Sequence, residues 1–290
     1  MKHLMKRGLL AATLLALVAC NASAPVEFDY IHLQNNVNGF VTTDADTAIA
    51  IGLKKGSPLK AGIDAYLSTL SNSYWTELMG QMVALQNDEN ATYTYSNPNV
   101  VTPEPSGLVF KVGMECAYDP YNWTQNDDSN GAVPIANVPN KFANGYDVQI
   151  ARQVAYAIGA TLEVYQYEWD ALIPALQTES ITGIVAGMSP TEERLKEIDF
   201  SAIYYQSNLV IISRKGSRLL ECKSLSEIDQ AGVKIAAQPG TFHLDALKAQ
   251  TKNLTVVDNL EDFVAMRIAL EAGTIDGYVA EEPTALTFCH

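Results

Sequence analysis

Short apolar runs alternate with segments of helical periodicity from residue 109 to the end of the chain. Residues 109–116 and 181–188 have the length and composition of buried strands, whereas residues 146–159 carry apolar side chains on one helical face and end at Gly159. This alternation predicts an α/β fold with mostly parallel sheets. Further strands are expected at 161–167, 208–214, 233–238, 254–258 and 275–280, and further helices at 171–178 with Asp170 as cap, from 242 onward and at 260–273.

The first part of the chain shows the same pattern. Residues 28–34 and 47–53 are strand-like, and Ser57 and Pro58 are suited to cap and open a helix over 59–70. Residues 85–107 then lose all periodicity and contain three prolines and four asparagines. We expect a linker or an extended surface strap there.

The first twenty residues are typical of an export signal. Three basic residues precede an apolar run that is too short to span a bilayer well. The run ends in Leu-Val-Ala-Cys at 17–20, which resembles a bacterial lipobox, so that Cys20 would be acylated and the peptide before it removed. The alternatives are an ordinary signal peptide that happens to contain a cysteine, or a simple anchor. The sequence therefore predicts an exported protein tethered to the membrane.

Charge and cysteine content restrict the possible partners. The net charge of −14 becomes −17 without the first 19 residues, with 16 basic against 33 acidic side chains. Nucleic-acid binding is not expected, because it needs clustered Lys and Arg. The remaining cysteines, Cys116, Cys222 and Cys289, are odd in number and not spaced as a zinc site, and the four histidines are scattered. No metal or cofactor is predicted.

Four segments carry a resemblance to a known family: residues 110–125, 145–159, 169–205 and 258–286. Together they resemble the extracytoplasmic solute-binding proteins of polar amino-acid ABC importers (family 3), over about residues 109–288. The resemblance implies the type II periplasmic-binding-protein fold, with two lobes, each a mostly parallel sheet flanked by helices, and a ligand cleft between them. It also implies a free polar amino acid as ligand and delivery to the permease and ATPase subunits of an ABC importer.

The order of the segments departs from the family. Residues 28–83 resemble the tail that follows residue 288 in family order, so we expect a circular permutant; the alternatives are a truncated piece or a swapped dimer. Lobe crossings are expected near Thr42–Thr47 and Tyr204–Asn208. The predicted division is 1–20 signal peptide, 21–27 tether, 28–46 strand and crossing of lobe 2, 47–84 lobe 1, 85–108 linker, 109–203 lobe 1, 204–208 hinge and 209–290 lobe 2.

The resemblance also assigns the residues that would bind the ligand carboxylate. Arg194 would bind it bidentately, since a guanidinium matches carboxylate geometry and stays charged when desolvated. The alternative for Arg194 is an ordinary place on a surface helix. Ser189 and the Gly187 backbone would assist from one lobe, and Thr241 with the Phe242 N–H would assist from the other.

The rest of the ligand would meet acids and aromatic rings. Glu281 would hold the ammonium, with Glu282 as its neighbouring candidate. Tyr118 and Trp169 would flank the ligand as walls, although an aromatic residue is more often core. Glu115 and Gln238 would contact the ligand side chain. Glu115 could accept hydrogen bonds from a cationic or amide group, which favours Lys, Arg, His or Gln as ligand.

The same fold also carries enzymes such as cyclohexadienyl dehydratases, so the fold alone does not fix the function. Glu115 and Glu281 are the candidates for acid–base catalysis, and both are better explained as partners of an amino acid. We therefore predict a binding protein and not an enzyme. A dehydratase-like enzyme remains one alternative. A ligand sensor or scaffold lipoprotein with a degenerate cleft is another.

Overall fold

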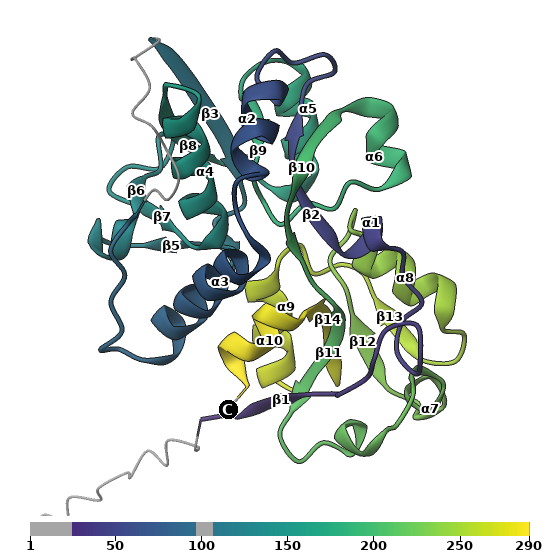
Figure 1. Cartoon of the computed structure of the whole chain (residues 1–290). Helices are drawn as coiled ribbons and strands as arrows, with labels where there is room; N and C mark the ends of the chain where they lie inside the picture. The colour runs from purple at the N-terminus through teal and green to yellow at the C-terminus, as the bar shows by residue number, and fades with distance from the viewer. Residues whose placement is uncertain (1–24, 97–106, 290) are drawn as a thin grey trace, which may run out of the picture.

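The computed structural model describes residues 25–96 and 107–289. The predicted signal peptide and Cys20 lie outside the described residues. Two five-stranded sheets form the centres of two lobes, drawn one above the other in Figure 1. Within the described residues, no helix is long and apolar enough to cross a membrane.

The sheet of the first lobe has the strand order β10-β2-β9-β3-β8. Only β2 runs against the other four strands, because its two pairings are antiparallel and the remaining pairings are parallel. The strands are β2 (Ala48–Leu53), β3 (Leu108–Met114), β8 (Ala160–Gln166), β9 (Gly183–Ile184) and β10 (Asp199–Gln206). The helices of this lobe are α2 (Lys60–Leu67), α3 (Asn72–Asn87), α4 (Tyr146–Ala157), α5 (Leu172–Gln177) and α6 (Glu192–Glu197).

The sheet of the second lobe has the order β1-β11-β14-β12-β13, and here only β11 runs against the others. Both sheets are thus mostly parallel, as the sequence predicts. The strands are β1 (Phe28–Tyr30), β11 (Leu209–Arg214), β12 (Lys234–Ala236), β13 (Thr255–Val257) and β14 (Gly277–Glu281). The helices are α7 (Leu225–Gln230), α8 (Phe242–Gln250), α9 (Phe263–Glu271) and α10 (Glu282–Phe288).

A third, antiparallel sheet was not expected from the sequence. Its order is β4-β5-β7-β6. Its strands are two to four residues long, too short to show a period: β4 (Ala117–Tyr118), β5 (Asn122–Gln125), β6 (Val133–Pro134) and β7 (Phe142–Asn144). Short 3-10 turns occur at Ser129–Gly131, Trp169–Ala171 and Arg218–Glu221.

The N-terminal part of the chain contributes to both lobes (Figure 1). Strand β1 pairs with β11 in the second lobe, and β2 lies between β10 and β9 in the first. Helix α1 (Asp44–Thr47) lies between β1 and β2 in the sequence, and the Ser207 amide donates to the Thr47 carbonyl at 2.9 Å. The two chain segments that connect the sheets therefore touch each other. The division into lobes at particular residues and the circular permutation stay predictions.

Three local expectations are wrong. Ser57 does not cap helix α2, which begins at Lys60 with Leu59 at the cap position. The Ser57 hydroxyl accepts from the Leu59 amide instead. Asp170 does not cap a helix, because residues 169–171 form a 3-10 turn and α5 begins at Leu172. The strand expected at 181–188 is reduced to Gly183–Ile184, although the segment is buried.

Candidate ligand site

A small cavity of about 20 Å³ lies between the lobes. All ten residues predicted to hold a ligand line it, and His243 and Phe263 line it as well. They come from strand ends and helix starts of both lobes, which is where ligands of open α/β sheets bind. The predicted residues that line the cavity are Glu115, Tyr118, Trp169, Gly187, Ser189, Arg194, Gln238, Thr241, Phe242 and Glu281.

Arg194 reaches the cavity from the first turn of α6. Thr191 caps this helix by accepting from the Arg194 amide, so the side chain leaves the helix at its N-terminal end. The guanidinium donates to the Ser189 carbonyl at 3.0 Å and to the Gly240 carbonyl at 3.1 Å. It lies 5.1 Å from the centre of the Trp169 ring. Burial lowers the pKa of Arg194 to about 10, which leaves it a cation at neutral pH.

Backbone geometry brings the first lobe close to the cavity at Gly187. This residue has φ of +63°, and a Cβ there would lie 3.0 Å from the Tyr118 ring. A glycine is thus favoured both by the conformation and by the close approach of the ring. Two residues further on, the Ser189 hydroxyl donates to the Asp46 carbonyl at 2.8 Å, which ties this loop to α1.

The second lobe presents the start of α8. Thr241 caps the helix by accepting from the Leu244 amide, and its hydroxyl donates to the Gln238 carbonyl at 2.7 Å. The N-terminal end of a helix carries unpaired N–H groups and a partial positive charge, both of which suit a carboxylate. Thr241 and Phe242 therefore lie where a ligand carboxylate would be stabilised.

Glu281 is the acid at the end of β14, and it is only 2% exposed. The Tyr118 hydroxyl donates to it at 3.1 Å from the other lobe. His243 Nε2 lies 3.6 Å from its other oxygen. Burial, with the charge of Glu281 nearby, raises the pKa of Tyr118 well above its usual value, so this phenol stays a donor.

Glu115 follows β3 and is 5% exposed. Gln238 Nε2 donates to its carboxyl group at 2.6 Å and to the Glu261 carbonyl at 2.8 Å. Burial raises the pKa of Glu115 to about 8, and the nearby acid Asp262 adds to the rise. Without a cation beside it, Glu115 is thus largely protonated at neutral pH.

The lobes are closed over this site. Trp169 Nε1 donates to the Gly240 carbonyl at 2.9 Å across the cleft. The bonds Arg194–Gly240, Gln238–Glu115 and Tyr118–Glu281 cross it too. A cavity of about 20 Å³ has room for little more than a water molecule, so the lobes must separate to admit a larger ligand.

His243 and Phe263 were not predicted. Phe263 stacks on Tyr118 with 4.0 Å between ring centres and an interplanar angle of 11°. His243 directly follows the predicted Phe242, and this adjacency at a helix start is the one signal that could have indicated it. Phe263 begins α9, and its sequence context is that of an ordinary core residue. Among residues 25–96 and 107–289, no cluster of side chains suits a metal ion.

Two mostly parallel α/β lobes that enclose one cleft, with side chains from both lobes around it, define a two-lobed binding protein. The chain belongs to the bacterial extracellular solute-binding proteins, family 3, whose family model matches residues 110–272.

Individual relatives agree with this membership. The chain is 30% identical over 207 residues to a probable histidine-binding protein of Campylobacter jejuni subsp. jejuni serotype O:2, which is 71% of each chain. Three other curated relatives are matched over 39% to 60% of their own length. The holo arginine-binding protein of T. maritima superimposes with a TM-score of 0.52 at 28% identity, over 62% of this chain and 72% of that one. The ancestral amino-acid-binding protein AncCDT-1, a precursor of cyclohexadienyl dehydratase, gives 0.52 at 26% identity, over 61% and 71%.

Proposed function

We propose that this chain is an extracytoplasmic receptor that binds a free polar amino acid between its lobes and delivers it to an ABC importer. The observation that carries the proposal is the charge pattern of the cleft. One arginine, Arg194, lies with the start of α8 near one part of the cavity, and Glu281 and Glu115 line it too. An α-amino acid carries one carboxylate and one ammonium, which this pattern complements.

Each ligand group has a proposed partner. Arg194, Ser189 and the start of α8 hold the carboxylate, and Glu281 holds the ammonium. Glu115 and Gln238 then face the ligand side chain. A cationic side chain would ionise Glu115, and an amide would exchange hydrogen bonds with Gln238. The ligand class is therefore Lys, Arg, His or Gln, and the histidine- and arginine-binding relatives support that class.

Closure supplies the signal for transport in this proposal. These four hydrogen bonds cross the cleft, and a ligand between the lobes adds contacts to both. The ligand thus favours the closed arrangement, which a permease can distinguish from the open one. Export and tethering through Cys20 complete the proposal.

A dehydratase activity is the second candidate, because the raised pKa of Glu115 suits an acid catalyst and one structural neighbour is a dehydratase precursor. Incubation with prephenate or arogenate, followed by chromatography of the products, tests it directly. We expect no turnover, because Gln238 donates a hydrogen bond to the Glu115 carboxyl group and the charged residues of the cavity complement an amino acid.

A thermal-shift screen against the twenty amino acids, ornithine and citrulline tests the receptor proposal. A ligand at a hundred times its Kd stabilises the folded state by about 2.7 kcal/mol, which raises Tm by several degrees. We expect a shift with one or a few polar amino acids. Arg194→Ala should remove the shift, whereas Lys196→Ala, an exposed change on the same helix, should preserve it. Retained amino-acid binding by Arg194→Ala would contradict the proposed role of Arg194 in binding the ligand carboxylate.

A further inference from the structure

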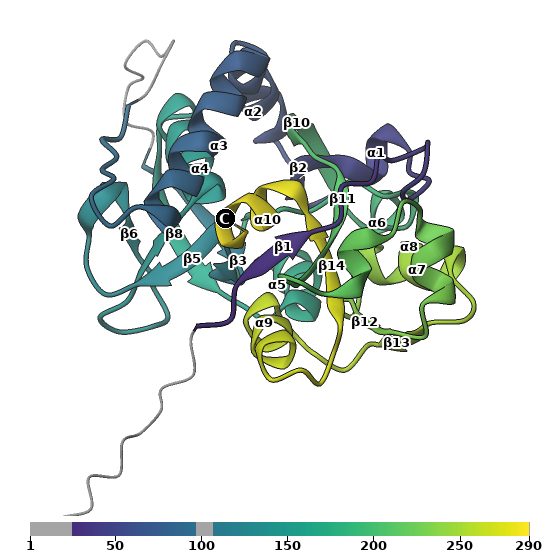
Figure 2. The ribbon, with the colours of Figure 1, turned by 90° about the horizontal axis from the view of Figure 1, so that it is seen from below.

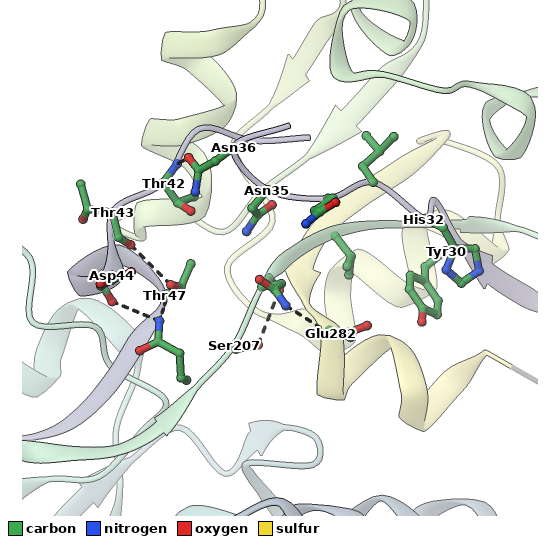
Figure 3. Close-up of a pocket in the computed structure, with 15 residues that line it drawn as sticks. Tyr30, His32, Asn35, Asn36, Thr42, Thr43, Asp44, Thr47, Ser207 and Glu282 are labelled. Atoms are coloured by element: carbon green, nitrogen blue, oxygen red, sulfur yellow. Dashed lines mark hydrogen bonds between the residues drawn. The ribbon is translucent and has the colours of Figure 1, made fainter. Parts of the chain in front are cut away.

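A second cavity, of about 520 Å³, lies at the hinge (Figure 3), and it shares no lining residue with the ligand cleft. Its walls are formed by residues within 30–36, 42–47 and 206–210, together with Glu282. Both chain segments that connect the two sheets are thus part of its lining. Its volume is in the range of sites that hold a small molecule.

The end of β14 separates the two cavities. Glu281 lines the ligand cleft, and the next residue, Glu282, lines the hinge cavity. Glu281 ends β14 and Glu282 begins α10, so the two side chains leave the chain from different elements. Asn208 Nδ2 donates to Glu282 at 3.5 Å, so the acid is linked to the segment that joins β10 to β11.

Asn35 is the observation that points to a ligand. Both polar atoms of its side-chain amide are buried, and neither has a partner within the described residues. Figure 3 shows this amide near the middle of the lining, between Asn36 and Ser207. A buried amide without partners is costly and rare in folded proteins. A molecule that offers both a donor and an acceptor would satisfy it once the side chain turns into the cavity.

The charge of the lining disfavours an anion. Asp44 and Glu282 are its acids, and no Lys or Arg of the described chain lines it. A second amino acid or a phosphate compound would have no cationic partner for its negative group, and the two acids would repel it. The other polar groups are amides and hydroxyls that both donate and accept, and the rings of Tyr30 and His32 lie 4.4 Å apart at one end. Vicinal hydroxyl groups match such a lining.

We propose that the hinge cavity binds a polyhydroxylated small molecule of monosaccharide size that carries no negative charge. The cavity exists in the arrangement in which the ligand cleft is closed. Both hinge segments line it, so an occupant that contacts this arrangement better than an open one stabilises it and raises the affinity for the amino acid by the same coupling. The coupling rests on the proposed function, whereas the binding itself does not.

Saturation-transfer NMR with three probes of one ring shape tests the site: D-glucose, D-glucosamine and D-glucuronate. We expect glucose and glucosamine to bind with Kd on the order of 1 mM. Glucuronate should bind at least tenfold more weakly, because Glu282 and Asp44 repel it. Asn35→Ala should weaken glucose binding about tenfold by removing two hydrogen bonds. Gln34→Ala changes an exposed side chain of the lining, so this second variant should fold normally and should also weaken glucose binding. Asn90→Ala, outside the lining, should change nothing.

The outcomes separate this site from the cleft. Arg194→Ala should bind glucose as the unaltered protein does, even where it has lost the amino acid, so a failed receptor proposal leaves this test intact. Absence of saturable binding by glucose and glucosamine, equal binding of glucuronate, or unchanged binding in both Asn35→Ala and Gln34→Ala would each overturn the proposal.

Discussion

Glu115 keeps its proton to higher pH than an ordinary carboxyl group because it is buried and faces other acids. Its pKa is about 8 in the folded protein against an ordinary 4.5. The folded state therefore binds more protons than the unfolded chain between these values, and the free energy of unfolding falls as pH rises through this window. At high pH the carboxyl group is ionised, and its buried charge destabilises the folded state.

Glu115→Gln should remove this dependence, because the new amide oxygen can still accept from Gln238. We expect the variant and the parent to be similar at pH 5 and the variant to be more stable by on the order of 3 kcal/mol at pH 9. Chemical denaturation at the two pH values measures it. Glu168→Gln, an exposed acid nearby, should show no such gain. An unchanged pH slope in Glu115→Gln would mean that Glu115 is ionised in the folded protein.

The same residue makes arginine binding pH-dependent in the proposed receptor. A guanidinium beside Glu115 favours its ionised form, so binding releases a proton. The arginine Kd should tighten by about tenfold or more between pH 6 and pH 8, whereas the Kd for glutamine should change little. Calorimetry in two buffers of different ionisation enthalpy measures the proton directly. Equal pH profiles for the two ligands would contradict this role of Glu115.

Single residues of the site were largely predictable. Arg194, Glu115 and Glu281 follow strands or begin helices at sheet edges, and the resemblance assigned them in advance. They line one cavity with the other predicted residues. His243 was missed because a lone histidine in a helix has no distinguishing spacing, and its place beside Glu281 arises only when α8 packs against β14.

Strand β2 shows how much the N-terminal segment contributes to the first lobe. It lies between β9 and β10, and Ile51 within it is fully buried, with its amide donating to the Ser201 hydroxyl at 2.9 Å. Ile51→Ala should destabilise the protein by about 3 kcal/mol through the cavity that it leaves. Ile203→Ala on neighbouring β10, where the side chain is 39% exposed, should cost about 0.5 kcal/mol or less. Equal effects on thermal unfolding would show that β2 is not part of this sheet in solution.

The major helices and strands were predictable because their periods extend over many residues, as in α4 and β3. Their ends were less so. Asp170 has the chemistry of a helix cap, yet its carboxylate lies against Gly240 of the other lobe, where an added Cβ would be 2.5 Å away. A contact between lobes thus replaces a local hydrogen bond, and no local pattern encodes such a contact. The third sheet escaped prediction because its strands are only two to four residues long, too short to show a period.

The order of segments departs from family order, and the circular permutation that we infer from it can be tested directly. Cys289 lies beside Phe28 through an isolated bridge, and Figures 1 and 2 both place the C-terminal end next to β1. A short flexible linker can therefore join 289 to 28 without disturbing either sheet. A circular permutant should accept the return to family order.

The rearranged chain would run from 107 to 289, through a glycine–serine linker of about eight residues, and then from 28 to 96. We expect it to be monomeric on size exclusion, to melt within about 5 °C of the parent, and to bind the same amino acid with an affinity within threefold. The three measurements separate the alternatives: a chain that folds only as a dimer would indicate swapping, and one that does not fold would contradict the permutation. A matched break inside β9, between Gly183 and Ile184, should abolish folding, because it cuts a buried strand that pairs with both β2 and β3.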